Sequence, residues 1–135
     1  MKTSFNDNGF KFVPAAVAGW LLIASCGTYA QQADLDKGAA LFATHCAECH
    51  SVKEGRDKKG PSLFAIVGTK SSLREGYSYS EALKASQIVW SPEELSRYIA
   101  NPKATVPGGR MRYEGLASAA DRADLIAYLA SQGKH

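Results

Sequence analysis

The spacing of apolar residues becomes helical shortly after position 33. Leu35, Gly38, Leu41 and Phe42 recur at three- and four-residue intervals, which place them on one face of a helix. Asp34 precedes them, and its carboxylate can accept hydrogen bonds from the free N–H groups of a first helical turn. The pattern therefore predicts a helix that begins after Asp34 and buries this face.

Helix-start patterns also mark two later segments. In the first, Ser91 is followed by proline at the first helical position and by Glu94 at the third, which is a capping box. Proline disfavours the helical conformation in the residue before it, so this helix should end by Asn101, ahead of Pro102. Its predicted buried face consists of Leu95, Tyr98 and Ile99.

A second capping box, Ser118-Ala119-Ala120-Asp121, predicts a last helix that runs to Gln132. A short helix should begin at Ser80, whereas residues 51–60 are polar and predict an exposed loop without strand character. The predicted fold class is therefore all-α. The apolar residues of the last helix are Leu125, Ile126, Tyr128 and Leu129.

Composition places the chain among ordinary globular domains. It has 135 residues, 45% of them hydrophobic and 21% charged, which favours one compact domain. The 16 basic and 13 acidic residues are interleaved and give a formal charge of +3, too mild a balance for a dedicated DNA- or RNA-binding surface. A domain this small often needs a disulfide, a metal or a cofactor to support its core.

The N-terminal segment has the form of a secretory leader. An uncharged apolar run over residues 12–24 follows a polar, basic start, and its 13 residues are well short of the roughly 20 that a membrane-spanning helix needs. Thr28 and Ala30 are small residues at the positions that a signal peptidase reads. We expect residues 1–30 to be a signal peptide and residues 31–135 to form an exported, periplasmic domain.

A different processing site is open at Cys26. Ile23-Ala24-Ser25-Cys26 resembles the lipobox of bacterial lipoproteins, in which the cysteine is lipidated and becomes the first residue. Under that alternative Cys26 would tether the domain to a membrane, with no transmembrane segment in the mature chain. With the first cut, Cys46 and Cys49 are the only cysteines of the mature domain.

These two cysteines lie in Cys46-Ala47-Glu48-Cys49-His50, the C-x-x-C-H pattern of covalent haem attachment. Two thiols one helical turn apart can each form a thioether to one edge of a porphyrin, while the adjacent imidazole reaches the iron. The alternatives are a zinc site, a dithiol redox centre or a disulfide. Zinc would need a second Cys or His pair, a dithiol centre would need strand-helix-strand patterning, and a disulfide would leave His50 unexplained.

The second axial ligand of such a haem is usually Met or another His. The mature chain has one methionine, Met111, in a Pro-Gly-Gly-Arg-Met sequence that favours a loop able to bring the sulfur over the open haem face. The alternative is a methionine that fills a core gap, although Arg110 and Arg112 are unsuited to a core. His45 lies on the attachment side and His135 is terminal, so neither reaches that face readily.

An ordered series of residues over positions 34–134 resembles the small class I cytochromes c, in particular the group of mitochondrial-like cytochrome c and bacterial cytochrome c2. The resemblance implies short helices wrapped around one covalently bound haem c, with the first and last helices crossing. The residues that carry it are Gly38, Phe42, Cys46-Ala47-Glu48-Cys49-His50, Gly60-Pro61-Ser62-Leu63, Gly76-Tyr77-Ser78-Tyr79, Trp90, Tyr98, Asn101-Pro102, Pro107-Gly108, Met111 and Asp124-Leu125-Ile126-Ala127-Tyr128-Leu129.

The resemblance also implies roles around the haem. Pro61 should accept a hydrogen bond from Nδ1 of His50, which orients the imidazole. Tyr79 and Trp90 should hydrogen-bond a buried propionate, and Tyr98 should lie under the axial sulfur. Each has an ordinary alternative, a turn proline in the first case and core packing for the aromatic residues.

Two positions depart from the family pattern. Gly109 stands where the family commonly has a threonine that hydrogen-bonds a propionate, so the ligand loop should be looser. Thr69 and Lys70 stand where the family often places an arginine after a glycine, and Lys70 or Arg74 is expected to substitute for it.

The resemblance implies an electron carrier rather than an enzyme. Its iron, ligated by His and Met, would alternate between Fe(II) and Fe(III) as the protein moves between a quinol-cytochrome c reductase and a terminal oxidase, reductase or photosynthetic reaction centre. We expect a soluble monomer that binds no nucleic acid. The alternatives are a lipid-tethered subunit of one dehydrogenase or oxidase and, with an open iron position, a peroxidase or ligand-binding haem protein. The basic residues expected to attract acidic partner faces are Lys53, Lys58, Lys59, Lys103, Arg110 and Arg112.

Overall fold

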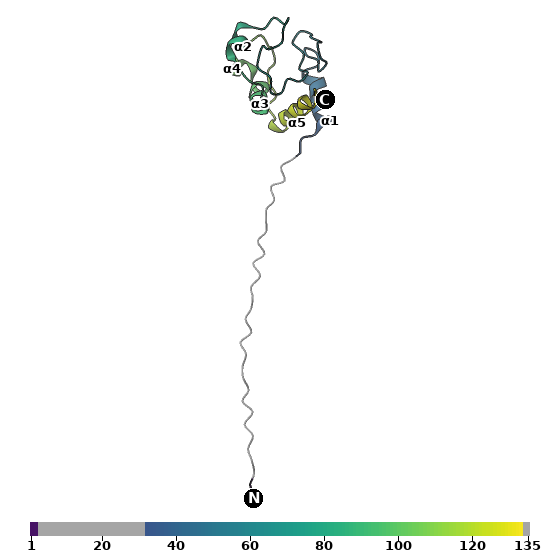
Figure 1. Cartoon of the computed structure of the whole chain (residues 1–135), viewed down its shortest axis with the longest axis vertical. Helices are drawn as coiled ribbons and strands as arrows, with labels where there is room; N and C mark the ends of the chain where they lie inside the picture. Colours follow the sequence, from purple (N-terminus) through teal and green to yellow (C-terminus); the bar gives the residue numbers. More distant parts are fainter. Residues whose placement is uncertain (3–31, 134–135) are drawn as a thin grey trace. The chain divides into compact units, whose positions relative to one another are not determined.

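The computed structural model describes residues 1–2 and 32–133 of the chain. The apolar run of the expected leader, its cleavage site, Cys26 and His135 lie outside these residues. Residues 31–135 form one unit, in whose described part five helices follow one another (Figure 1). The helices are α1 (Leu35–His45), α2 (Glu81–Ser86), α3 (Pro92–Ala100), α4 (Pro102–Thr105) and α5 (Ala119–Ser131).

Four of these helices begin where the capping residues predict. The side-chain oxygens of Asp34, Ser80, Ser91 and Ser118 each accept a hydrogen bond from the backbone N–H three residues on, at 3.0–3.2 Å. Each bond satisfies one of the N–H groups that a first helical turn leaves unpaired. The expected starts of α1, α2, α3 and α5 are therefore confirmed.

The single-turn helix α4 was not expected. Asn101 ends α3, as the following proline requires, but its side-chain Oδ1 also accepts the N–H of Ala104 at 3.0 Å and so caps a new turn. Pro102 takes the first helical position of that turn, where its missing N–H costs nothing. One Asn-Pro pair thus stops one helix and starts the next.

α1 and α5 cross at Gly38, as the resemblance implies. A Cβ added to Gly38 would lie only 2.7 Å from Cβ of Tyr128, so glycine is needed for the two helices to approach. One helical turn further on, the ring of Phe42 lies 5.7 Å from that of Tyr128. The expected burial of Leu35 is wrong, because the side chain of this first α1 residue remains 50% exposed.

The core lies between α1, α3 and α5 (Figure 1). Leu125 and Leu129 on α5 are fully enclosed, and the partly buried Tyr98 packs against the same cluster. Over residues 32–133 the only strand-like pairing is one isolated bridge between Lys70 and Val89, which confirms the all-α class. None of the described helices is long and apolar enough to cross a membrane. The buried cluster consists of Phe42, Trp90, Leu95, Ile99, Leu116, Leu125, Ile126 and Leu129.

Candidate haem site

The C-x-x-C-H residues form a tight turn at the end of α1. The N–H of Cys46 still bonds to the carbonyl of Phe42 at 2.9 Å, and the N–H of His50 returns to the carbonyl of Cys46 at 2.8 Å. Cys46 and Cys49 are half-buried free thiols. Burial, with a smaller effect of Cys49, raises the pKa of Cys46 to about 11, so this thiol is neutral near pH 7.

His50 follows the turn and is held in one orientation. Its Nδ1 lies 2.7 Å from the carbonyl oxygen of Pro61. Because a carbonyl can only accept, Nδ1 carries the proton and Nε2 is left with its lone pair. Burial lowers the pKa of the imidazole, the charge of Lys58 lowers it further, and the bond to Pro61 opposes both. The ring is thus favoured as a neutral base with one free nitrogen.

Residues 58–61 lie across the C-x-x-C-H turn and hold it in place. The N–H of Gly60 donates to the carbonyl of Cys49 at 2.8 Å, and the ammonium of Lys58 donates to the carbonyl of Ala47. Lys59 forms an ion pair of 2.5 Å with Glu48. Two of the lysines expected on the outer rim therefore bond to the attachment turn itself.

Two of the three expected haem-pocket aromatics, Trp90 and Tyr98, contact each other in the core. Trp90 is only 6% exposed, and its ring lies 5.0 Å from that of Tyr98. Burial raises the pKa of Tyr98 and is also the largest cause of the raised pKa of Tyr79. Cys46, Tyr98 and Tyr113 are all partly buried and pack against the core cluster, of which Trp90 is a member.

Met111 is half-buried in the loop between α4 and α5. It lines a hollow of about 430 Å³ together with Lys103, Gly109, Arg110 and Arg112. The guanidinium of Arg110 donates to the carbonyl of Ser78, which ties this loop to the segment before α2. Met111 and His50 lie in separate segments of the chain, the loop before α5 and the turn after α1.

Sequence reasoning did not single out Tyr113, two positions after Met111. Its ring meets the exposed ring of His45 edge-on, with 6.1 Å between centroids. Its hydroxyl is buried and has no hydrogen-bond partner among the described residues. An aromatic residue so near the only mature methionine was the available sequence clue.

The structure separates the two basic residues expected to substitute for the family arginine. Lys70 is exposed at the backbone bridge to Val89. Arg74 is half-buried, and its Nε lies 3.0 Å from Oδ1 of Asp57 in an ion pair without hydrogen-bond alignment. The charge of Arg74 also lowers the pKa of Tyr79, against the larger effect of burial. Arg74 is therefore the basic residue beside the expected propionate site.

Comparison with known proteins decides the family. A family model described as cytochrome c matches residues 35–133. The chain belongs to the cytochrome c family. The cytochrome c of Gibberella zeae is 48% identical over 102 residues, which cover 75% of this chain and 96% of that protein. The cytochrome c2 of Rhodopila globiformis is 48% identical over 93 residues (69% and 88%), and the cytochrome c of Arabidopsis thaliana is 43% identical over 104 residues (76% and 93%).

Cytochromes c carry one covalently attached haem c and pass single electrons, so this chain is a single-haem electron carrier. The residues of the candidate site fit that group. Two free thiols are separated by two residues, and the Nε2 of the neighbouring imidazole has no described hydrogen-bond partner. The buried hydroxyl of Tyr113, without a partner among the described residues, also fits a pocket built around an added group.

Proposed function

We propose that Cys46 and Cys49 bind the haem covalently and that His50 and Met111 supply the two axial ligands of its iron. The observation that carries this proposal is the orientation of His50. Its Nδ1 is committed to the carbonyl of Pro61 at 2.7 Å, and burial favours the neutral ring, so Nε2 is a ready ligand beside two free thiols.

The haem iron, when bound, supplies reversible one-electron exchange between its ferrous and ferric states. The task of the chain is to hold the ligand atoms still and to keep water out. Pro61 fixes His50, and the soft thioether of Met111 favours the ferrous state. Tyr79 and Trp90 would donate hydrogen bonds to a propionate, and Tyr98, whose ring lies 5.0 Å from that of Trp90, would lie under the Met111 sulfur.

We infer that the mature protein is periplasmic and carries electrons between membrane-bound partners. The leader-like segment supports export. A quinol-cytochrome c reductase as donor and a terminal oxidase, reductase or photosynthetic reaction centre as acceptor fit a monomeric one-electron carrier. The basic side chains exposed near the attachment turn and the Met111 loop favour acidic faces on these partners.

Absorption spectra of the haem-loaded protein test the ligand assignment. The ferric wild type should show the weak near-infrared charge-transfer band of iron bound by methionine sulfur, and the reduced protein should not react with carbon monoxide. Met111→Ala should lose the band and bind carbon monoxide. Arg112→Ala is the matched control, because it changes the next residue of the same loop and keeps the sulfur.

The opposite result would identify a different class of protein. A wild type that lacks the band and binds carbon monoxide readily has an open iron position. The proposed function of an electron carrier with two fixed axial ligands would then be wrong, and a peroxidase or a ligand-binding haem protein would be the better assignment.

A lipid-tethered form is the second candidate, supported by the lipobox-like residues that end at Cys26. Such a protein would serve one dehydrogenase or oxidase at the membrane instead of diffusing between partners. The mass of the exported N-terminus separates the two forms. A first residue Gln31 supports the diffusing carrier, whereas an acylated Cys26 supports the tethered subunit.

A further inference from the structure

The loop that carries Met111 spans residues 106–118, between α4 and α5. Its middle is largely exposed, and Arg110 and Arg112 on either side of Met111 face solvent. Exposed loop backbone opens more readily than a packed helix. The position of the Met111 side chain therefore depends on the bond from Arg110 to the carbonyl of Ser78 and on how the two ends of the loop are attached to the rest of the protein.

The first end is attached by α4 and the core. Val106 is 3% exposed, and its N–H donates to the carbonyl of Pro102 at 2.9 Å. The N–H of Gly109 donates to the carbonyl of Val106 at 2.9 Å. This end is held by backbone bonds and apolar burial alone.

The second end is attached differently. Leu116 is 8% exposed, and its N–H donates to the carbonyl of Ile99 at 3.0 Å. The carbonyls of Leu116 and Ala117 both accept from Nη1 of Arg122, each at 2.7 Å. Among the described residues no other side chain donates to these two carbonyls, so one guanidinium closes this end of the loop.

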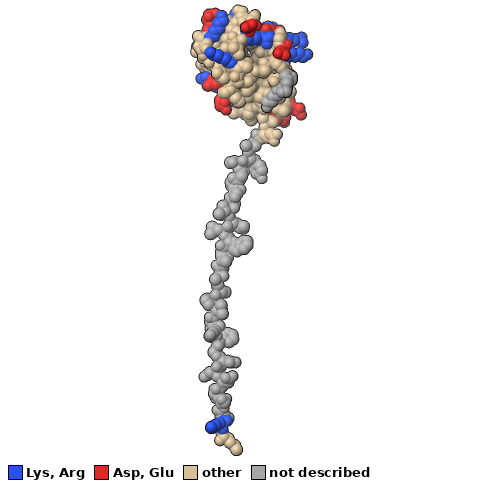
Figure 2. All heavy atoms as spheres, viewed as in Figure 1, with Lys and Arg blue, Asp and Glu red and all other residues tan. Residues whose placement is uncertain are grey.

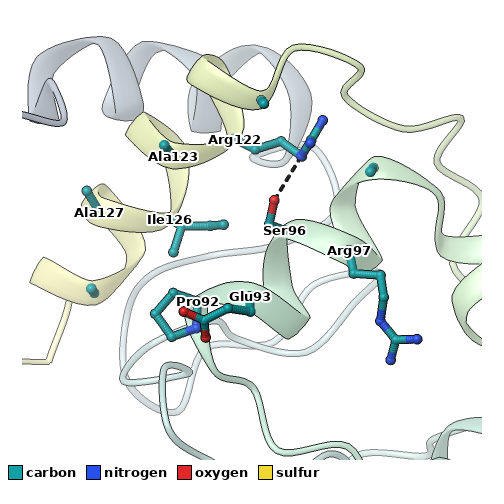
Figure 3. Close-up of a pocket in the computed structure, with 11 residues that line it drawn as sticks. Pro92, Glu93, Ser96, Arg97, Arg122, Ala123, Ile126 and Ala127 are labelled. Carbon is teal, nitrogen blue, oxygen red and sulfur yellow. Dashed lines mark hydrogen bonds between the residues drawn. The ribbon is translucent and has the colours of Figure 1, made fainter. Parts of the chain in front are cut away.

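Arg122 is itself fixed from the side of α3. Its Nε donates to Oγ of Ser96 at 3.0 Å across the groove between α3 and α5 (Figure 3). A guanidinium has five N–H donors, so the bond from Nε to Ser96 is separate from the two bonds that Nη1 donates to the loop. Arg122 therefore donates three hydrogen bonds: one joins α5 to Ser96 on α3, and two join α5 to the Met111 loop.

We propose that Arg122 is a positioning residue that holds the Met111 loop closed and thereby sets how often the Met111 sulfur leaves the iron. The inference rests on the proposed ligation by Met111. Without the guanidinium, two carbonyls five and six residues after Met111 lose their side-chain donor. The open form of the loop then becomes more populated, and an external ligand gains access in proportion.

Imidazole binding to the ferric haem-loaded protein measures this population. Imidazole competes with the Met111 sulfur, and its apparent affinity rises with the open fraction, while the near-infrared band reports the sulfur bond directly. Arg122→Met should raise the imidazole affinity by roughly ten- to a hundredfold, as expected for the loss of hydrogen bonds from a charged donor. Arg122→Lys should give a smaller increase, because one ammonium replaces only part of the fork.

Two control variants separate loop closure from general stability. Ser96→Ala removes the bond between α3 and α5 but leaves both loop carbonyls bonded, so its imidazole affinity should stay within about twofold of wild type. Arg97→Met removes a positive charge from the same groove and should also leave the affinity unchanged, because Glu94 is the one described residue that forms an ion pair with Arg97.

Three results would overturn the inference. Arg122→Lys and Arg122→Met with wild-type imidazole affinity would show that the guanidinium does not hold the loop. An increase in Ser96→Ala equal to that in Arg122→Met would assign the effect to helix packing. If the wild type lacks the near-infrared band, both the ligation by Met111 and the role of Arg122 are wrong. If the wild type has the band but the Arg122 variants keep wild-type imidazole affinity, only the role of Arg122 is wrong. If Arg122→Met does not fold, the imidazole affinities of Arg122→Lys and Ser96→Ala are compared instead, and only a greater increase in Arg122→Lys supports the inference.

Discussion

Gly60 is a residue whose missing side chain makes room for the imidazole of His50. An added Cβ would lie 2.8 Å from Nδ1 and 2.9 Å from Nε2 of His50, closer than nonbonded atoms approach. The same residue is buried and bonds through its N–H to the carbonyl of Cys49. Glycine at this position therefore lets the imidazole lie directly against the backbone that leads into Pro61.

Gly60→Ala should displace the His50 ring and weaken its bond to Pro61. Overpacking of this kind destabilises a fold by about 1–3 kcal/mol. The weakened bond makes the imidazole a poorer donor to iron, so the reduction potential should rise. Denaturant unfolding and redox titration of the haem-loaded protein measure both effects.

The control for this variant is Gly55→Ala in the same loop. Gly55 has φ +69°, and an added Cβ would meet nothing within 4 Å. The change should cost about 1 kcal/mol of backbone strain without moving the potential. Equal potentials for wild type and Gly60→Ala would show that the ring tolerates the methyl group.

The sequence indicates the candidate donor atoms of the site better than their surroundings. Cys46, Cys49 and His50 stand out because their spacing is that of covalent haem attachment, and Met111 because residues 31–135 contain no other methionine. Tyr113 and Arg122 could not be found this way. Their roles depend on contacts between segments that are distant along the chain, and no local pattern encodes such contacts.

Among the helices, the start of α1 is fastened to α5 by charge. Asp124 is only 7% exposed and accepts the N–H of Asp34 at 2.9 Å. Lys37 lies 2.6 Å from Asp121 and 3.1 Å from Asp124. The N–H of Asp34 and then Lys37 hold the pKa of Asp124 below its ordinary 3.8, and Lys37 is the largest cause of the lowered pKa of Asp121.

These lowered pKa values predict acid sensitivity. A carboxylate whose pKa is lower in the folded than in the unfolded chain stabilises the fold fully above its unfolded value. That contribution is lost as the pH falls through 3.8 and then through the folded pKa. The free energy of unfolding should therefore fall as the pH drops below about 4. Denaturant unfolding at several pH values measures the slope.

Asp124→Asn should reduce this slope and lower stability at pH 7, because the amide still accepts the Asp34 N–H but no longer pairs with Lys37. Lys37→Met removes the ion pairs with both Asp121 and Asp124 and leaves both carboxylates in place, so it should also flatten the curve. An acid dependence identical in all three proteins would mean that these pairs do not contribute.

Local chemistry predicts helix starts in this chain more reliably than helix faces. Ser91 and Ser118 cap their helices as expected, because a cap needs only the next three residues. The exposure of Leu35 and the burial of Asp124 were not foreseen. Both follow from where α5 crosses α1, and that crossing is set by tertiary packing.

Over the whole molecule, basic and acidic side chains are interspersed on the visible surface (Figure 2). The expected basic rim is therefore weaker than its residue count implies. Lys59 pairs with Glu48 and Lys103 pairs with Glu114, so each of these lysines is locally neutralised. Lys53 forms no ion pair with any described residue, so no paired carboxylate neutralises its positive charge. Attraction of an acidic partner should depend on such unpaired charges.

Lys53→Ala should slow electron transfer to an isolated acidic-faced oxidase by about two- to threefold at low ionic strength, with the difference vanishing in high salt. The control combines Lys59→Ala with Glu48→Ala, which deletes a neutral pair and keeps the net charge. Stopped-flow rates across a salt series measure both. A control as slow as Lys53→Ala would show that the position, not the free charge, matters.

The crossing of α1 and α5 also sets the order of events while the protein is made. The amide of Asp34 meets the carboxylate of Asp124 across 90 residues, so α1 has no partner until almost the whole domain has been synthesised. Closing so long a loop is slow compared with forming a single helix. Cys46 and Cys49 lie just after α1. They therefore stay accessible to covalent modification until α5 has been synthesised and packs against α1.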